Sequence, residues 1–85
     1  MEIRYSKQAQ KDIRKLPKDV ARLIKQAIEG LIENPPKGDI KTMQGYSDGR
    51  KRLRVGKYRV VYQYINDGSI CVWIIEVGSR GDIYK

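Results

Sequence analysis

Alternating arginines in the second half of the chain are the residues best suited to do chemistry. Arg50, Arg52 and Arg54 are separated by single residues, and Arg59 follows a Gly-Lys turn. The planar guanidinium group binds a phosphate diester through two parallel hydrogen bonds, which a lysine ammonium group does not match. If these arginines share one side of a sheet, they predict a phosphate-binding surface. The alternative is a solvated sheet face whose charge is relieved by Glu76.

The overall charge also favours a polyanionic partner. Lysine and arginine number 18 against 10 aspartates and glutamates, a formal net charge of +8 in 85 residues. Nucleic acid is the first candidate partner and an acidic protein the second. A basic surface that is simply solvated is the third interpretation. A chain of this length supports only one hydrophobic core, so we expect a single domain over residues 1–85.

The residue types that are missing exclude several kinds of active site. The chain has no histidine, which excludes His-based zinc sites, Ser-His triads and two-histidine ribonuclease chemistry. Its single cysteine, Cys71, stands in an apolar run and excludes a disulfide framework or a thiolate cage. We therefore expect no metal or other cofactor. The unpaired cysteine and the lack of an apolar signal-peptide core near Met1 predict a cytoplasmic protein with no membrane span.

The first half of the chain predicts a strand and a helix hairpin. Glu2 to Tyr5 alternates like a strand, and Ser6 offers an N-cap for a helix that Pro17 ends. From Val20 to Ile32 the apolar residues recur at a spacing of three and four, which predicts a longer helix with one apolar stripe. The two helices should pack by their apolar face onto a sheet.

The second half predicts an antiparallel β-meander. Its strands and two-residue turns are expected at Arg50–Val55, Gly56-Lys57, Tyr58–Ile65, Asp67-Gly68 and Ile70–Val77. Lys37 to Gly49 is rich in turn-forming residues and is interpreted as an irregular connector. The predicted fold class is therefore α+β, with an N-terminal strand and a two-helix hairpin packed on an antiparallel β-meander.

Two-residue turns would fix the pairing of the strands and thus the face of each side chain. Pairing Leu53 with Val60 and Ile65 with Ile70 collects an apolar core face: Leu53, Val55, Tyr58, Val60, Tyr62, Tyr64, Cys71, Trp73, Ile75 and Val77. The opposite face carries Arg50, Arg52, Arg54, Arg59, Val61, Gln63, Ile74 and Glu76. Arg54 then opposes Arg59, a like-charge contact that destabilises a sheet by roughly a few tenths of a kcal/mol. On the next strand, this pairing places Glu76 directly opposite Arg59. An anion that binds this face would relieve the repulsion.

The C-terminal residues could complete such a site. Gly78 and Gly81 permit sharp turns, so Arg80 and Tyr84 could return beside the arginines. The alternative for Tyr84 is a packed or frayed terminal residue.

Three segments carry a resemblance to a known family: Arg52 to Tyr62 (RLRVGKYRVVY), Val77 to Arg80 (VGSR) and Asp82 to Tyr84 (DIY). Together with the helix hairpin ahead of them, they resemble the RelE/ParE toxin superfamily over nearly the whole chain. The resemblance implies a type II toxin, a ribosome-dependent and metal-independent mRNA interferase of the RelE type that cleaves the codon in the ribosomal A site. It also implies a cognate antitoxin that wraps around the toxin in a hetero-oligomer. The functional residues that it implies are Arg50, Arg52, Arg59, Arg80 and Tyr84.

Departures from the family pattern bear on the proton acceptor. RelE has lysines where this chain has Arg50 and Arg52, and several relatives carry histidine at the position of Ser79. Arginine cannot accept a proton near neutral pH. We therefore take Tyr84 as the candidate base, its pKa lowered by nearby arginines, with Glu76 in reserve.

Different roles are expected for the cations, and other functions stay open. Arg59 and Arg80 would hold the non-bridging phosphate oxygens, while Arg50, Arg52 and Arg54 bind the RNA strand. A ParE-like toxin of the same fold would inhibit DNA gyrase without nuclease chemistry. A basic nucleic-acid-binding module without catalysis would explain the charge but would not use Tyr84.

Overall fold

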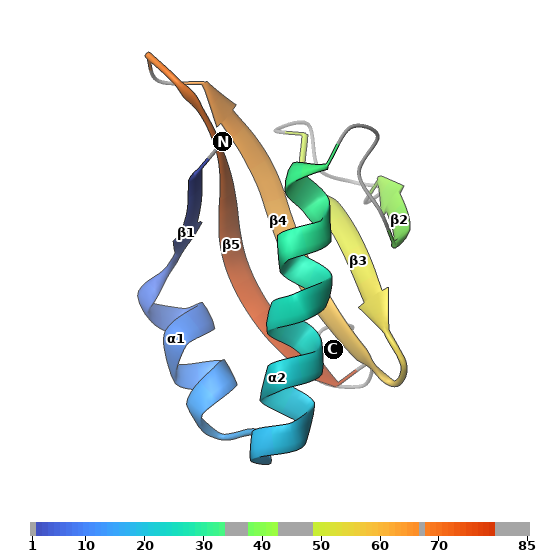
Figure 1. The fold of residues 1–85 in the computed structure, drawn as a ribbon. Helices are drawn as coiled ribbons and strands as arrows, with labels where there is room; N and C mark the ends of the chain where they lie inside the picture. Colours follow the sequence, from blue (N-terminus) through green and yellow to red (C-terminus); the bar gives the residue numbers. More distant parts are fainter. Residues whose placement is uncertain (1, 34–37, 43–48, 67, 80–85) are drawn as a thin grey trace.

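The computed structural model describes residues 2–33, 38–42, 49–66 and 68–79. Its elements, in chain order, are β1 (Glu2–Tyr5), α1 (Lys7–Arg14), α2 (Lys18–Glu29), the 3-10 turn η1 (Gly30–Ile32), β2 (Asp39–Thr42), β3 (Lys51–Val55), β4 (Tyr58–Asn66) and β5 (Ile70–Ser79). They build a five-stranded sheet of order β1-β5-β4-β3-β2, in which only the described pair β1 and β5 is parallel. Both helices pack on one face of this sheet (Figure 1). The predicted α+β class is confirmed, with the meander set inside a mixed sheet.

The helix hairpin forms where the sequence predicts it. The Ser6 hydroxyl caps α1 by accepting a hydrogen bond from the Ala9 N–H at 2.9 Å, and Pro17 stands at the N-cap of α2. The apolar stripe of α2 and η1 buries Ile24 and Leu31 completely, whereas Leu23 on the same helix is 59% exposed. The sheet therefore covers only part of the stripe. No helix among the described residues is long and apolar enough to cross a membrane.

The segment predicted as an irregular connector contains a strand. Asp39–Thr42 pairs antiparallel with β3 and sets Ile40 opposite Leu53. A strand of four residues with one apolar side chain is too short to show a periodic pattern in the sequence. It forms because β3 offers it an edge to pair with.

The first hairpin of the meander has the predicted register, but the second does not. Leu53 pairs with Val60 across a turn whose Gly56 has a φ of +59°, a conformation that glycine adopts without strain. In the second hairpin Asn66 pairs with Ile70, so residues 67–69 connect the strands in place of the predicted pair of residues.

A β-bulge follows in β5. Val61 pairs with Glu76 but Tyr62 pairs with Ile74, which leaves Ile75 as the extra residue. A slip of one residue exchanges the two faces of a strand, so Ile74, predicted for the arginine face, lies in the core. The extra residue at the bulge reverses the alternation a second time, so Val77 lies in the core, as predicted.

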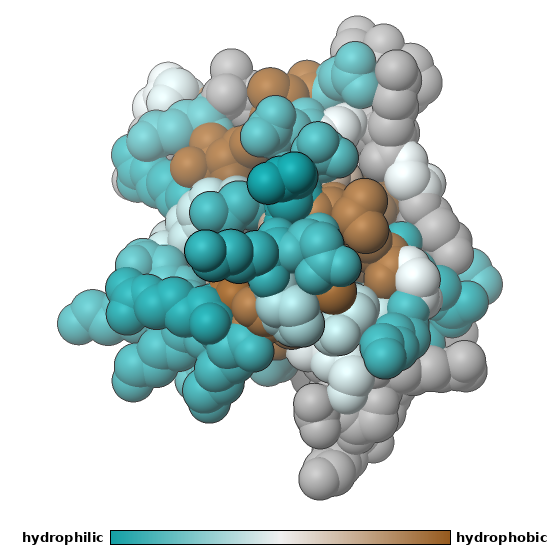
Figure 2. All heavy atoms as spheres, turned by 60° about the horizontal axis from the view of Figure 1, so that its bottom comes forward, coloured by the Kyte–Doolittle hydropathy of each residue, from teal (hydrophilic) through white to brown (hydrophobic). Residues whose placement is uncertain are grey.

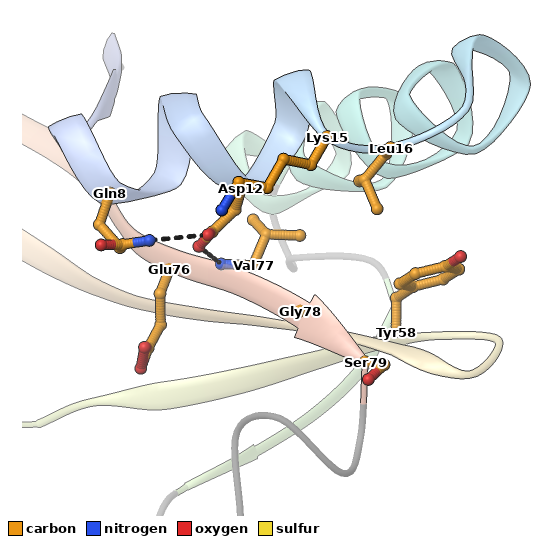
Figure 3. Close-up of a pocket in the computed structure, with 9 residues that line it drawn as sticks. All are labelled: Gln8, Asp12, Lys15, Leu16, Tyr58, Glu76, Val77, Gly78 and Ser79. Atoms are coloured by element: carbon orange, nitrogen blue, oxygen red, sulfur yellow. Dashed lines mark hydrogen bonds between the residues drawn. The ribbon is translucent and has the colours of Figure 1, made fainter.

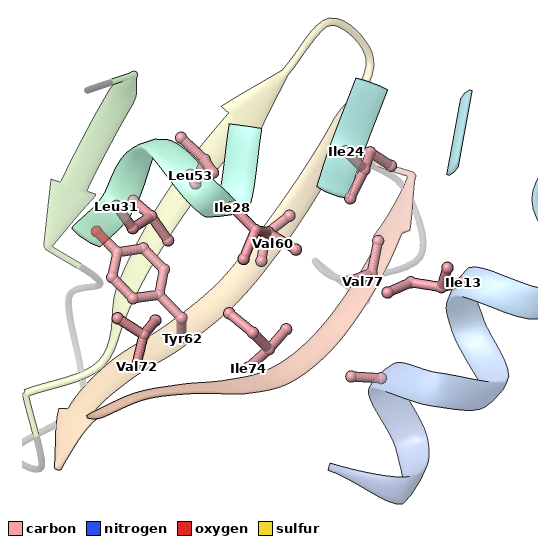
Figure 4. Close-up of a cluster of buried hydrophobic side chains, with 11 residues drawn as sticks. Ile13, Ile24, Ile28, Leu31, Leu53, Val60, Tyr62, Val72, Ile74 and Val77 are labelled. Atoms are coloured by element: carbon pink, nitrogen blue, oxygen red, sulfur yellow. The ribbon is translucent and has the colours of Figure 1, made fainter. Parts of the chain in front are cut away.

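The core lies between the helices and one face of the sheet (Figure 4). Its buried members are Ala9, Ile13, Ile24, Ile28, Leu31, Leu53, Val60, Tyr62, Val72, Ile74 and Val77. Val55, Tyr58 and Tyr64 pack against this cluster, as predicted, whereas the predicted core residues Cys71, Trp73 and Ile75 lie outside it. The error follows from the longer connection between β4 and β5, because that single residue inverts the first half of β5.

Candidate nucleic-acid interface

The face of the sheet without helices carries the arginines. Across β3 and β4, Arg52 pairs with Val61 and Arg54 pairs directly with Arg59, while Arg50 comes immediately before β3. Because residues opposite each other in a sheet point to the same side, Arg52, Arg54 and Arg59 share one face. We call Arg52, Arg54, Arg59 and Lys41 the basic face.

Lys41 is a member of the basic face that the sequence did not reveal. It lies on β2 directly opposite Arg52 and is exposed. A lysine in a segment rich in lysine, glycine and aspartate gives no signal of its own. Only the pairing of β2 with β3 identifies it.

Arg59 is the exceptional arginine of this face, because it is only 2% exposed. The sequence predicted a solvent-facing position. Burying a guanidinium group is unfavourable unless its surroundings compensate it, so this side chain is held by the fold and does not move freely in water. A side chain that is already ordered loses little conformational entropy when it binds an anion.

A hollow opens beside Arg59 at the β3–β4 turn. It has a volume of about 330 Å³ and is lined by Arg54, Gly56, Lys57, Tyr58 and Arg59; we call it the turn hollow. The Lys57 Nζ atom lies 5.8 Å from the centre of the Tyr58 ring, within the range of a cation–π contact. Among the described residues of the lining, the charged side chains are all cations, a composition that attracts an anion such as a phosphate group.

Glu76 is placed differently from the prediction. Its cross-strand partner is Val61, and the partner of Arg59 is Gly78, because of the bulge in β5. The predicted direct pairing of Glu76 with Arg59 is therefore wrong. The Glu76 side chain points away from α1, to the other side of β5 (Figure 3).

A second hollow, of about 380 Å³, lies between α1 and the end of β5; we call it the α1–β5 hollow (Figure 3). Its lining is Gln8, Asp12, Lys15, Leu16, Tyr58, Glu76, Val77, Gly78 and Ser79. The end of the molecule that carries the α1–α2 connection and the β3–β4 turn is shown in Figure 2, where hydrophilic residues cover much of the surface and apolar patches emerge between them.

Comparison with known proteins identifies the family. Residues 3–84 match the family model of the ParE toxin of type II toxin–antitoxin systems, parDE. The chain belongs to the RelE/ParE superfamily of toxins. A curated protein of Methanocaldococcus jannaschii that is named as a toxin, RelE1, is 36% identical over 86 residues, which cover 98% of this chain and 93% of the relative.

Solved structures agree with this assignment. The toxin resembles a chain of the toxin–antitoxin complex RelBE2 from Mycobacterium tuberculosis with a TM-score of 0.75 and 26% identity, covering 93% of this chain and 96% of the other. It resembles the isolated RelE toxin of E. coli with a TM-score of 0.74 and 28% identity, covering 98% and 89% of the two chains. The RelE-like fold predicted from the sequence is thereby confirmed.

The tyrosines buried inside the toxin are unsuitable as proton acceptors. Burial raises the pKa of Tyr62 and of Tyr64, whose rings meet edge to face at 5.8 Å, and Tyr64 donates a hydrogen bond to the Leu31 carbonyl at 3.2 Å. Burial also raises the pKa of Tyr5. All three phenols therefore keep their protons near neutral pH.

The remaining predicted residues of the toxin, Arg80 and Tyr84, lie outside the described residues. The last described residue of β5, Ser79, pairs with Tyr58. The predicted cations Arg52, Arg54 and Arg59 thus lie on described strands, whereas the predicted base belongs to the segment that follows β5.

Proposed function

We propose that this toxin is an endoribonuclease that cuts messenger RNA in the ribosomal A site and so inhibits translation. The observation that carries the proposal is the buried Arg59 beside a hollow whose described charged residues are all cations, on the same face as Arg52 and Arg54. A preorganised cation is what a reaction that builds negative charge on phosphate requires. The similarity to RelE toxins supports the same function.

The proposed reaction uses the 2′-hydroxyl of the RNA as the nucleophile. The hydroxyl must lose its proton, the pentacovalent phosphorane must be stabilised and the 5′-oxygen must be neutralised as it leaves. Arg59 and Arg80 stabilise the phosphorane, and Arg80 also assists the leaving group. Tyr84 accepts the proton, with Glu76 as the reserve candidate, and no metal or cofactor takes part.

The strand itself is bound by other cations. Arg50, Arg52 and Arg54 contact successive phosphates and fix the position of the RNA without reading its sequence. Lys41 adds to them from β2. Their contribution to affinity should weaken with salt, because each neutralised phosphate releases counterions.

A cognate antitoxin is proposed as the protein partner. The relative from Mycobacterium tuberculosis was solved as a toxin–antitoxin complex. An antitoxin segment with acidic and apolar residues would complement the basic face and compete with RNA for it. The toxin and its ribosomal target would then meet in the cytoplasm whenever the antitoxin is absent.

One experiment tests the nuclease proposal directly. Purified toxin is added to a translation extract, new 5′ ends are mapped on a reporter message, and the assay is repeated with naked RNA. Cuts that coincide with translated codons are expected. An intact message would refute the proposal, and equal cutting of naked RNA would refute the dependence on the ribosome.

A second candidate function is supported by the family model, which is that of ParE toxins. In this alternative the toxin inhibits DNA gyrase by binding and has no nuclease activity. A gyrase supercoiling assay separates the two functions. Loss of supercoiling together with an intact message would select the gyrase inhibitor.

A further inference from the structure

Trp73 lies on the same face of the sheet as the arginines. Its neighbours on β5, Val72 and Ile74, belong to the core, and successive side chains of a strand point to opposite faces. Both helices cover the core side (Figure 1), so the ring lies on the other side, where it is partly exposed. The longer connection between β4 and β5 therefore brings an aromatic ring to a face for which the sequence predicted none.

The pairing of the strands places Trp73 between an amide and an arginine. Its cross-strand partner is Gln63 on β4 and Arg4 on β1. Paired residues of a sheet point to the same side, so both polar groups flank the ring. Arg4 forms an ion pair of 3.2 Å with Glu2, which largely balances the charge on that side of the ring. We call Trp73 together with Gln63 the aromatic platform.

The aromatic platform continues the basic face. On β4, Gln63 lies two residues after Val61, the partner of Arg52, a step of about 7 Å along a strand. Lys41, which is exposed on β2, lies directly opposite Arg52. Cations therefore stand close to a ring whose own surroundings are nearly neutral. Single-stranded nucleic acid carries the complementary pair of groups, a charged backbone and flat bases that stack on aromatic side chains.

Gln63 adds a hydrogen-bonding group beside the ring. Its side-chain oxygen is shielded from water and accepts no hydrogen bond from the part of the chain that the structure describes. A buried acceptor without a donor is unfavourable. Every RNA base carries an N–H group on its edge, so rotation of the amide toward a base stacked on Trp73 would give this oxygen a donor.

We propose that Trp73 stacks on an unpaired base of single-stranded RNA whose backbone follows the basic face, with the Gln63 amide at the edge of that base. This inference rests on the proposed function and adds to it a subsite for a base. Every base has a π face, so the subsite raises affinity without selecting a sequence. A protein partner docked here would instead use the apolar area of the ring, which an aliphatic side chain can also supply.

The fluorescence of Trp73 tests the proposal in the unmodified protein, because it is the only tryptophan of the chain. A 2′-O-methyl hexanucleotide of adenine, which lacks the attacking hydroxyl and cannot be cut, is titrated into the full-length toxin. The anisotropy of a dye on the oligonucleotide follows binding independently. Stacking should quench the tryptophan emission in proportion to binding.

The matched control is a sugar–phosphate hexamer of the same charge without bases. It should bind through the basic face and leave the emission unchanged at saturation. Equal quenching by the two hexamers, or no quenching by saturating adenine hexamer, would overturn the proposal.

Two substitutions separate stacking from apolar contact. Trp73→Phe keeps a π face, whereas Trp73→Leu keeps apolar surface without one. The Phe variant should bind the adenine hexamer within about threefold of the wild type, and the Leu variant about tenfold more weakly, the scale of one lost stacking contact. Thermal unfolding verifies that both are folded. Equal affinities of the two folded variants would contradict stacking and would indicate an apolar surface of the kind that a protein partner uses.

Gln63→Met tests the edge of the base, because it keeps the length of the side chain and removes its amide. The variant should bind the adenine hexamer about fivefold more weakly, the scale of one hydrogen bond, and the hexamer without bases as tightly as the wild type does. The control is Leu23→Ala, an exposed apolar residue of α2 on the helix side, which should alter neither affinity. An unchanged affinity, or an equal loss for both hexamers, would remove Gln63 from the subsite.

The cleavage assay in the translation extract separates this inference from the proposed function. If the wild type cuts the message but saturating adenine hexamer leaves the Trp73 emission unchanged, the subsite is wrong and the nuclease proposal stands. If the hexamer quenches the emission but the message stays intact, the toxin binds RNA by stacking without cutting it, and the nuclease proposal is wrong.

Discussion

The two faces of the sheet come from the same strands but carry different residues: one face packs in the core, and the other carries arginines. On the helix side, Leu53 and Val60 are buried among aliphatic neighbours, and little about them except size and shape matters. On the other side, Arg54 and Arg59 oppose each other, an arrangement that packing alone would disfavour. Arg59 and Val60 are adjacent in sequence and both buried, but only Val60 belongs to the hydrophobic core. Substitutions one position apart should therefore have separable effects on stability and on cleavage.

The largest effect on stability is expected in the core. Ile28→Ala removes a fully buried side chain beneath the sheet and should lower the free energy of unfolding by about 2–5 kcal/mol. Leu23→Ala, on the same helix but 59% exposed, should change it by about 0.5 kcal/mol or less. Urea denaturation measures both. Similar losses in the two variants would mean that α2 packs by a different face.

The largest effect on chemistry is expected at Arg59. Arg59→Ala should slow single-turnover cleavage by about 10²- to 10³-fold, the usual loss when a preorganised group at a developing charge is removed. Arg59→Lys is the matched control, because it keeps the charge but loses the planar fork, and it should recover part of the rate. A wild-type rate in folded Arg59→Ala would remove this residue from the mechanism.

Tyr84→Phe tests whether the C-terminal segment supplies the base. The proposed loss of a proton acceptor should slow cleavage by about 10²-fold, and ribosome binding should stay intact because the ring is retained. Single-turnover rates and a ribosome pelleting assay measure the two effects. Unchanged cleavage would transfer the role to Glu76, and Glu76→Gln would then be the variant to examine.

A smaller effect is expected where the basic face only binds the strand. Arg52→Ala should weaken RNA binding and lower the salt slope by about one without altering the rate at saturation. Arg22→Ala on α2 is the control, since Arg22 is exposed on an element that packs against the opposite side of the sheet. A lower saturated rate in Arg52→Ala would give Arg52 a part in the chemistry.

The smallest effect is expected in the pH dependence of the free energy of unfolding, through Tyr62 on the core face. Burial raises the pKa of Tyr62, so the folded toxin keeps a proton that the unfolded chain loses above a pH of about 10. The free energy of unfolding should therefore be unaffected by this group below that pH and should fall as the pH rises further. Tyr62→Phe should lessen the fall, which urea midpoints between about pH 8 and pH 11 would show. An identical decline in both proteins would assign the alkaline sensitivity to other groups.

Local patterns predicted the helices, the meander and the first hairpin, since each is specified by neighbouring residues. The bulge at Ile75 escaped prediction because side chains from distant parts of the chain contact β5 there. The Ser6 hydroxyl donates to the Ile75 carbonyl, and Asp12 accepts from the Val77 N–H, across sequence separations of 69 and 65 residues. No local pattern reports such contacts.

The candidate site was likewise predictable only where neighbouring residues specify the structure. Alternation brought Arg52, Arg54 and Arg59 to one face, because the first hairpin has a turn that the sequence specifies. The burial of Arg59 and the position of Lys41 opposite Arg52 depend on contacts between distant parts of the chain. The hollow between α1 and β5 depends on how a helix lies on a strand edge, which residue types alone do not define.

The contacts of Ser6 and Asp12 with β5 also bear on unwanted association. An exposed strand edge is a template on which another chain can pair and aggregate. β1 pairs with β5 only as far as Ile74. Beyond that point, Ser6 at the N-cap of α1 and Asp12 in α1 form hydrogen bonds with the Ile75 carbonyl and the Val77 N–H, backbone groups that could otherwise pair with another chain. A partner that captures this protein by adding a strand would therefore approach the outer edge of β1 or of β2, and loosening α1 would favour fibre-like self-pairing.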